Sequence, residues 1–124
     1  MMWKKADTFC DNEMAAAILA TDDPKLMKQY GRKVSPFNPT YWGKHSQDFV
    51  YNANYAKFTQ NEDLKQSLLA TVGTTLAEAA PRDTLWGIGL GNTEKAHDRK
   101  NWRGQNLLGE ILTKVRDKIA LENG

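Results

Sequence analysis

The sequence predicts an α+β fold: a predominantly helical single domain with a small, incomplete β-sheet. Capped stretches with apolar residues at helical spacing fill most of the 124 residues, which indicates several amphipathic helices. Two short runs after Gly73 are rich in Thr, Leu, Trp and Ile, which is typical of strands. Two short strands alone make only a marginal sheet, so the sheet is expected to be incomplete. The length suits one domain over residues 1–124.

Local start and stop signals place each predicted helix. Asp23 followed by Pro24 starts the third helix, because an aspartate caps the free N–H groups and proline fits the first turn. Gly31 is expected to end that helix in a left-handed conformation. Asn12 is expected to cap the second helix, and Asn38 with Pro39 opens the fourth. The predicted helices cover residues 2–9, 13–20, 24–31, 40–58, 62–71 and 105–121.

The predicted strands cover residues 74–80 and 84–90 and are separated by Pro81-Arg82-Asp83. Residues 91–104 form a polar loop in this interpretation. The last helix is the clearest element of the chain, since its apolar residues recur on one face. They are Leu107, Leu108, Ile111, Leu112, Val115 and Ile119.

Composition excludes several classes of protein. No apolar stretch approaches the roughly 18 residues of a membrane span, and the first residues lack the apolar region of a secretory signal. The single cysteine, Cys10, favours a reducing compartment, which predicts a cytoplasmic protein. One cysteine and the distant His45 and His97 match no metal-ligand spacing. The net charge of +2 is mixed along the chain, so a nucleic-acid ligand is compatible but not indicated.

Glycines and tryptophans mark candidate ligand-binding segments. Gly87 lies in an alternating glycine run, which brings backbone close to a ligand or simply allows a tight bend. Trp86 and Trp102 stand in glycine-rich polar settings and offer flat walls for a ring, whereas the helical position of Trp42 favours core packing over stacking on a ligand. Gly109 inside the last helix indicates close approach by another backbone segment.

Charged and polar residues complete the candidate site. Asp83 either caps its own turn or supplies a carboxylate at the edge of a cleft. Asn106 at the start of the last helix either holds a phosphate near free amides or ties down the preceding loop. Lys5 and Arg32 are candidate phosphate partners.

Seven segments, in this order, resemble the NADAR, or YbiA-like, N-glycosidase family across nearly the whole chain. The two late segments together are specific, although each alone is weak. The matching segments are residues 1–6 (MMWKKA), 18–21 (ILAT), 31–34 (GRKV), 57–61 (KFTQN), 68–71 (LLAT), 81–90 (PRDTLWGIGL) and 102–109 (WRGQNLLG).

The resemblance implies a metal-free and cofactor-free enzyme that hydrolyses the bond between ribose phosphate and a base nitrogen. Its substrate class would be a phosphorylated ribosyl-base intermediate of riboflavin biosynthesis, or ADP-ribose attached to guanine in nucleic acid. It also implies that a strand-rich segment with a catalytic glutamate, which precedes these residues in the family, is missing here. A binding remnant without hydrolysis therefore stays open.

A hypothesis for the site follows from this resemblance. Asp83 would be the catalytic carboxylate that stabilises an oxocarbenium-like sugar or orients water. The remaining family-matched positions would bind substrate around one cleft: Lys5, Arg32, Trp42, Trp86, Gly87, Trp102 and Asn106.

Overall fold

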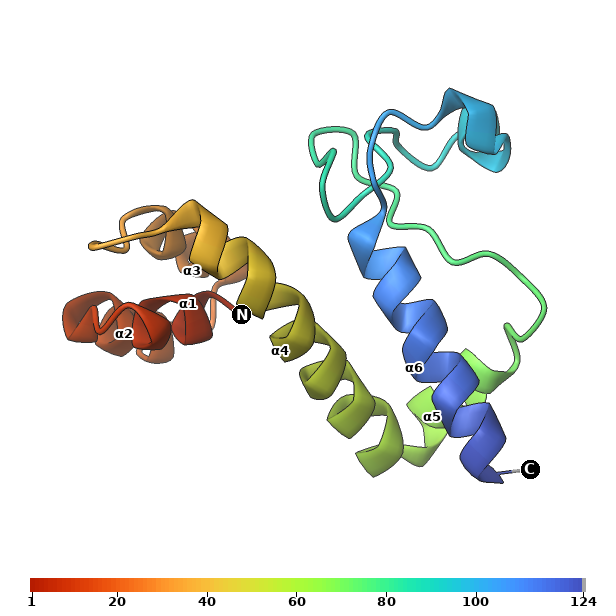
Figure 1. Cartoon of the computed structure of the whole chain (residues 1–124), viewed down its shortest axis with the longest axis horizontal. Helices are drawn as coiled ribbons and strands as arrows, with labels where there is room; N and C mark the ends of the chain where they lie inside the picture. Colours follow the sequence, from red (N-terminus) through yellow and green to blue (C-terminus); the bar gives the residue numbers. More distant parts are fainter. Residues whose placement is uncertain (124) are drawn as a thin grey trace. The chain divides into compact units, whose positions relative to one another are not determined.

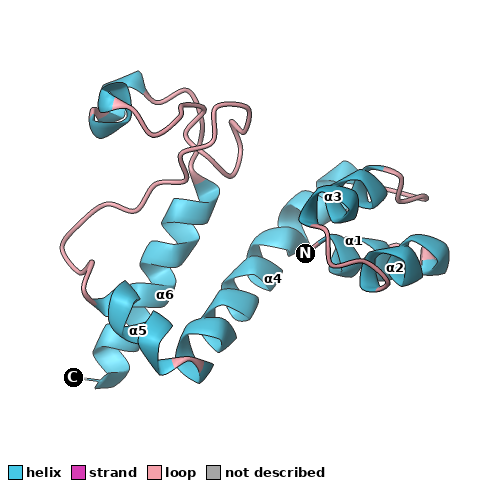
Figure 2. Ribbon diagram, turned by 180° about the vertical axis from the view of Figure 1, so that it is seen from behind, coloured by secondary structure: helices cyan, strands magenta, loops and turns pink. Residues whose placement is uncertain are grey.

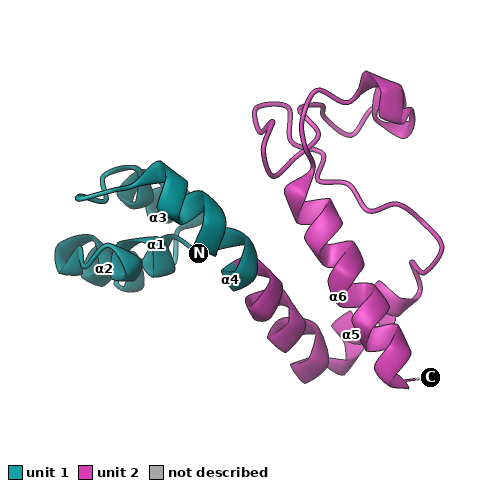
Figure 3. Ribbon diagram, viewed as in Figure 1, with its two compact units in different colours: residues 1–49 teal, residues 50–124 magenta. Residues whose placement is uncertain are grey.

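The computed structural model describes residues 1–123 and divides the chain into two compact units, Met1–Phe49 and Val50–Gly124 (Figures 1 and 3). The helix α4 runs through the boundary between them. The elements, in chain order, are α1 (Met2–Thr8), α2 (Asn12–Leu19), α3 (Pro24–Arg32), α4 (Pro39–Gln60), α5 (Glu62–Leu69), the short 3₁₀ helices η1 (Glu94–His97) and η2 (Arg99–Asn101), and α6 (Leu107–Asn123).

The predicted β-sheet is wrong. Residues 1–123 contain no strand, and residues 74–80 and 84–90 run as irregular loop (Figure 2). Their backbone groups bond to scattered partners instead of a regular ladder: the N–H of Ile88 donates to Glu78 O (2.9 Å), and the N–H of Gln105 donates to Thr84 O (2.8 Å). A positive φ of 72° at Gly89 also turns the chain where a strand would continue. The fold is therefore helical rather than α+β.

The first unit packs α1, α2 and α3 around the buried residues Ala6, Ile18 and Val34. Gly31 does not end α3 as expected: it lies inside the helix, and Lys33 follows as a C-cap with right-handed backbone. The reason is packing, because an added Cβ at Gly31 would overlap the side chain of Met2. This glycine therefore serves helix–helix contact instead of helix termination.

Side-chain caps begin three of these helices. The carboxylate Oδ1 of Asp23 accepts from Lys25 N at 3.0 Å, and Asn38 Oδ1 accepts from Tyr41 N at 3.1 Å, as the sequence predicted. The cap of α2 is Asp11 rather than Asn12, with Oδ1 accepting from Met14 N at 3.1 Å. Its other oxygen accepts from Ser35 N at 2.9 Å, so Asp11 also fastens the connector before α4.

The second unit is centred on α6. Ile111, Val115 and Ile119 are buried along one face of this helix. The helix α5 contacts α6. Arg116 is buried as well and donates through Nη1 to Thr71 O and Thr74 O, both at 2.9 Å. These bonds close the turn after α5 against α6.

The end of α4 is joined to the end of α6 inside the same unit. The hydroxyl of Tyr55 donates to the carboxylate of Glu122 at 2.7 Å, and Lys118 Nζ lies 4.7 Å from the centre of the Tyr55 ring. In the described part of the chain, none of the helices combines the length and the apolar character that a membrane span needs.

Candidate functional site

The candidate residues of the second unit belong to one interwoven segment at the N-terminal end of α6. Three successive N–H groups donate into the loop that contains Asp83 and Trp86: Asn106 N to Gly87 O (3.0 Å), Leu107 N to Leu85 O (3.0 Å) and Leu108 N to Trp86 O (3.1 Å). The start of α6 therefore holds the 83–87 turn directly. The family-matched segments 81–90 and 102–109 are thus brought together by backbone hydrogen bonds.

Asp83 organises this turn through one carboxylate oxygen. Its Oδ1 accepts from the N–H of Leu85 at 3.0 Å and of Trp86 at 2.8 Å, while its backbone oxygen accepts from Gly89 N at 3.1 Å. Neither side-chain bond uses Oδ2, and the residue is half-buried. The capping role considered from the sequence is present, and it leaves one carboxylate oxygen outside these bonds.

Gly87 is buried where no side chain fits. A Cβ at this position would lie 2.9 Å from Asp83 O and 3.0 Å from Glu78 O. Gly104 faces the same packing, since a Cβ there would overlap Gly87 O. Gly87 and Gly104 are therefore glycines because backbone segments approach each other closely there. Trp86, which precedes Gly87, is half-buried on this turn.

Asn106 connects the loop of residues 76–87 to the start of α6. It is 1% exposed and has a left-handed backbone with φ of 56°, which asparagine tolerates better than most residues. Its Oδ1 accepts from Glu78 N and its Nδ2 donates to Leu76 O, each at 2.9 Å. The Asn106 side chain thus ties the loop to α6.

The absence of a side chain at Gly109 allows the Asn106 side chain to bond to both Glu78 N and Leu76 O. This pair of hydrogen bonds is called the clasp below. A Cβ at Gly109 would overlap Leu76 O and both polar atoms of the Asn106 side chain. The close backbone approach that the sequence indicated at Gly109 is confirmed, with the 76–78 segment as the approaching backbone.

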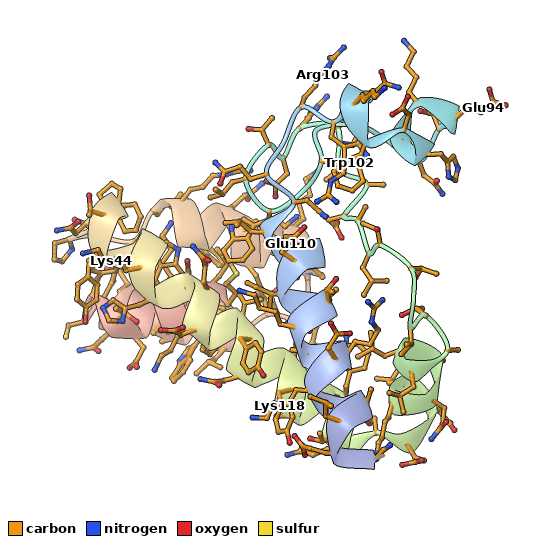
Figure 4. All side chains as sticks on the ribbon, turned by 45° about the vertical axis from the view of Figure 1, so that its right-hand side comes forward. Lys44, Glu94, Trp102, Arg103, Glu110 and Lys118 are labelled. Carbon is orange, nitrogen blue, oxygen red and sulfur yellow. The ribbon has the colours of Figure 1, made fainter. Side chains whose placement is uncertain are left out.

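Trp102 lies beside the short helices and is held on its edge and on one face (Figure 4). Its Nε1 donates to Ala96 O at 2.8 Å. The guanidinium carbon of Arg99 lies 5.1 Å from the ring centre, and Arg99 Nη2 pairs with Glu110 Oε1 on α6 at 3.2 Å. An aromatic wall with an attached cation therefore stands at the N-terminal end of α6.

The first unit contains Lys5, Arg32 and Trp42. Lys5 is half-buried, burial lowers its pKa below the ordinary value, and its Nζ lies 4.3 Å from the centre of the Phe37 ring. Trp42 is 9% exposed and packs edge-on near Phe9, with ring centres 6.4 Å apart. Arg32 is exposed in the last turn of α3.

Three residues with a defined place near these candidates escaped sequence reasoning. The sequence places Arg99 only in the polar loop of residues 91–104, and it marks neither Glu110 nor Phe37 as a candidate. A spacing of 11 residues between Arg99 and Glu110 signals no contact unless the intervening bend is known. The aromatic residue beside Lys5 was equally hidden, since Phe37 reaches it only through the packing of the connector.

Comparison with known proteins gives a family match over nearly the whole chain. The model of the family described as NADAR domain matches residues 1–120. Protein irg-1 of Caenorhabditis elegans is 41% identical over 121 residues, which make up 95% of this chain and 57% of that protein. An N-glycosidase of Acanthamoeba polyphaga mimivirus is 42% identical over 119 residues, 95% of this chain and 70% of that protein.

More distant relatives extend this picture. N-glycosidase YbiA of Shigella boydii serotype 4 is 29% identical over 118 residues, 95% of this chain and 68% of that protein. Riboflavin biosynthesis protein PYRR, chloroplastic, of Arabidopsis thaliana is 34% identical over 82 residues, 66% of this chain and 12% of that protein. The chain spans 57% of the length of irg-1 and about two thirds of the two N-glycosidases.

Proposed function

The chain belongs to the NADAR domain family, and from this premise we propose that it is an N-glycosidase. The observation that carries the proposal is the alignment of 95% of this chain with relatives named N-glycosidases. The bond cleaved would join C1′ of a phosphorylated ribose to a base nitrogen. Because that bond breaks through an oxocarbenium-like sugar, the enzyme must stabilise positive charge, direct a water to C1′ and assist the leaving base.

Asp83 suits the first two tasks. A carboxylate whose Oδ1 is fixed by two backbone N–H groups is held in one orientation, so Oδ2 can face the sugar or a water without reorganising. In the proposed step, the oxygen of water bonds to C1′ as the C1′–N bond breaks. One water proton passes to Asp83 Oδ2, and the leaving nitrogen takes a proton from the medium or from another acid.

The other predicted residues take binding or supporting roles in this proposal. Trp86 and Trp102 of the second unit would wall the base and sugar. Lys5 and Arg32 of the first unit stay proposed phosphate partners, as the family resemblance implies. Trp42 would support the aromatic side chains next to Lys5. Asn106 and Gly87 would act by fixing the turn of Asp83, because both are buried in backbone contacts.

We propose a phosphorylated ribosylamino-pyrimidine of the riboflavin-intermediate type as the substrate. The partial match to a riboflavin biosynthesis protein supports this choice. The exposed, free thiol of Cys10 fits the reducing cytoplasm that we propose as the compartment.

The decisive experiment is an assay for release of ribose 5-phosphate from such a compound by the chain and two variants. Asp83→Asn keeps an Oδ1 acceptor for the turn but removes the negative charge, so activity should fall by about a hundredfold or more while the unfolding midpoint changes little. Asp23→Asn is the matched control: this aspartate makes the same kind of turn, with Oδ1 3.0 Å from Lys25 N, and its replacement should leave activity unchanged.

The possible results distinguish the proposed mechanism from its alternatives. Full activity of Asp83→Asn would remove this residue from the mechanism. Binding of the substrate without any release would refute the hydrolase and favour the ribose-phosphate-binding remnant. Release from ADP-ribosylated guanine in DNA, with none from the pyrimidine, would assign the alternative substrate class.

A further inference from the structure

Arg99 is the cation most firmly oriented beside the candidate site of the second unit. Its guanidinium lies 5.1 Å from the centre of the Trp102 ring and pairs with Glu110 Oε1 through Nη2 at 3.2 Å. A guanidinium that lies over an indole in a cation–π contact and is held by a carboxylate is pre-oriented, so little side-chain freedom is lost when it meets a ligand.

The same guanidinium keeps most of its donors for a ligand. The pair with Glu110 uses Nη2, and the side chain is 67% exposed. Since the N–H groups of a guanidinium lie in a planar fork, they can meet two oxygens of a phosphate at once. Lysine, as a point charge, has no equivalent fork.

The surrounding charge also favours an anion. Residues 94–103 contain four basic and two acidic residues, a net charge of +2. The paired Glu110 lowers the net charge of this group to +1, which is still positive. One of the two acids, Asp98, caps the N–H of Lys100 at 3.0 Å. Figure 4 shows Arg103 and Glu94 toward opposite ends of this region.

We propose that Arg99 is a phosphate-binding residue that makes this protein prefer phosphorylated ribosides to unphosphorylated ones. The proposal rests on the N-glycosidase function and names a determinant of its substrate class. The indole of Trp102 orients Arg99, and Glu110 holds it until a phosphate takes over part of its hydrogen bonding. The cations expected from the sequence, Lys5 and Arg32, lie in the other unit, so Arg99 is an addition to them.

The test measures binding by calorimetry, with ribose 5-phosphate and ribose as probes, and needs no turnover. Arg99→Gln should weaken binding of ribose 5-phosphate by about tenfold, the usual loss for one charge-assisted contact, without changing the response to ribose. Arg99→Lys should fall between the two proteins, because it keeps the charge and loses the fork. Lys100→Gln is the matched control, with the same change of charge on a neighbouring exposed residue, and should lose less than about twofold.

Three results would overturn the proposal. Equal weakening by Arg99→Gln and Lys100→Gln would mean a general effect of charge, and unchanged binding in Arg99→Gln, or absence of phosphate-dependent binding in the parent chain, would mean that Arg99 only fastens η2 to α6. Failure of the proposed function looks different: ribose 5-phosphate would bind through Arg99 while no riboside is hydrolysed.

Discussion

Gly109→Ala provides the sharpest test of the clasp between the loop and α6. In a helix this substitution ordinarily stabilises by up to about 1 kcal/mol, because alanine has the higher helix propensity. Here the new Cβ would overlap Leu76 O and the side chain of Asn106, so that side chain must move. It would lose its bonds to Glu78 N and Leu76 O, both 2.9 Å long.

The magnitude follows from the two bonds at stake. Each buried group left without its partner costs about 1–3 kcal/mol, and the gain in propensity offsets about 1 kcal/mol of the total. We therefore expect the free energy of unfolding to fall by roughly 1–5 kcal/mol. Urea titration followed by circular dichroism, and separately by tryptophan fluorescence, measures this change.

Gly43→Ala is the matched control, because nothing lies within 4 Å of a Cβ built at that helical glycine. It should raise the free energy of unfolding by up to about 1 kcal/mol. Asn106→Gly removes the clasp but keeps the left-handed backbone accessible, so the cost of Gly109→Ala should shrink in that background. If Gly109→Ala instead raised the free energy of unfolding, as expected for Gly43→Ala, the clasp would not exist.

Two further predictions concern other contacts of the second unit. The hydrogen bond to Glu122 raises the pKa of Tyr55 above its ordinary value. The contact therefore stabilises the fold below the pKa of the unfolded chain, and this stabilisation is lost as pH rises through the folded pKa. In an absorbance titration, Glu122→Gln should move the Tyr55 transition to lower pH, and an unmoved transition would contradict the assignment. Arg116→Met leaves the oxygens of Thr71 and Thr74 without their donor and should lower the free energy of unfolding by about 2–4 kcal/mol. The exposed Lys114→Met should stay within about 0.5 kcal/mol of the parent, and equal losses at both positions would mean that Arg116 makes no such bonds.

The helices were predictable because their signals are local. Asp23 with Pro24, and Asn38 with Pro39, mark helix starts within a few residues of the contacts they make. The loop of the second unit was not predictable, because its organising bonds join Asn106 to residues 28 and 30 positions earlier. Thr, Leu and Trp in that loop resemble a strand by composition, but their backbone groups are used by the start of α6.

The candidate site shows the same division. Asp83, Trp86, Gly87 and Asn106 could be selected from turn chemistry and from resemblance. The role of each residue could not be predicted from the sequence, since Asn106 and Gly87 prove to be buried in backbone contacts. Arg99 was hidden for the same reason, as its value depends on a stacking partner and on a carboxylate of α6.

The hydrogen bonds between the start of α6 and the 85–87 turn also bear on how the proposed site would bind a phosphate. A helix N-terminus usually offers its first N–H groups to an anion, but the N–H groups of Asn106, Leu107 and Leu108 donate to the 85–87 carbonyls instead. The residues that would bind anions therefore hold the turn on which Asp83 stands. In the proposed site, side-chain cations would then bind the phosphate, and a binding site made of exposed cations weakens as salt screens it. Affinity for ribose 5-phosphate should accordingly fall with rising ionic strength while affinity for ribose does not.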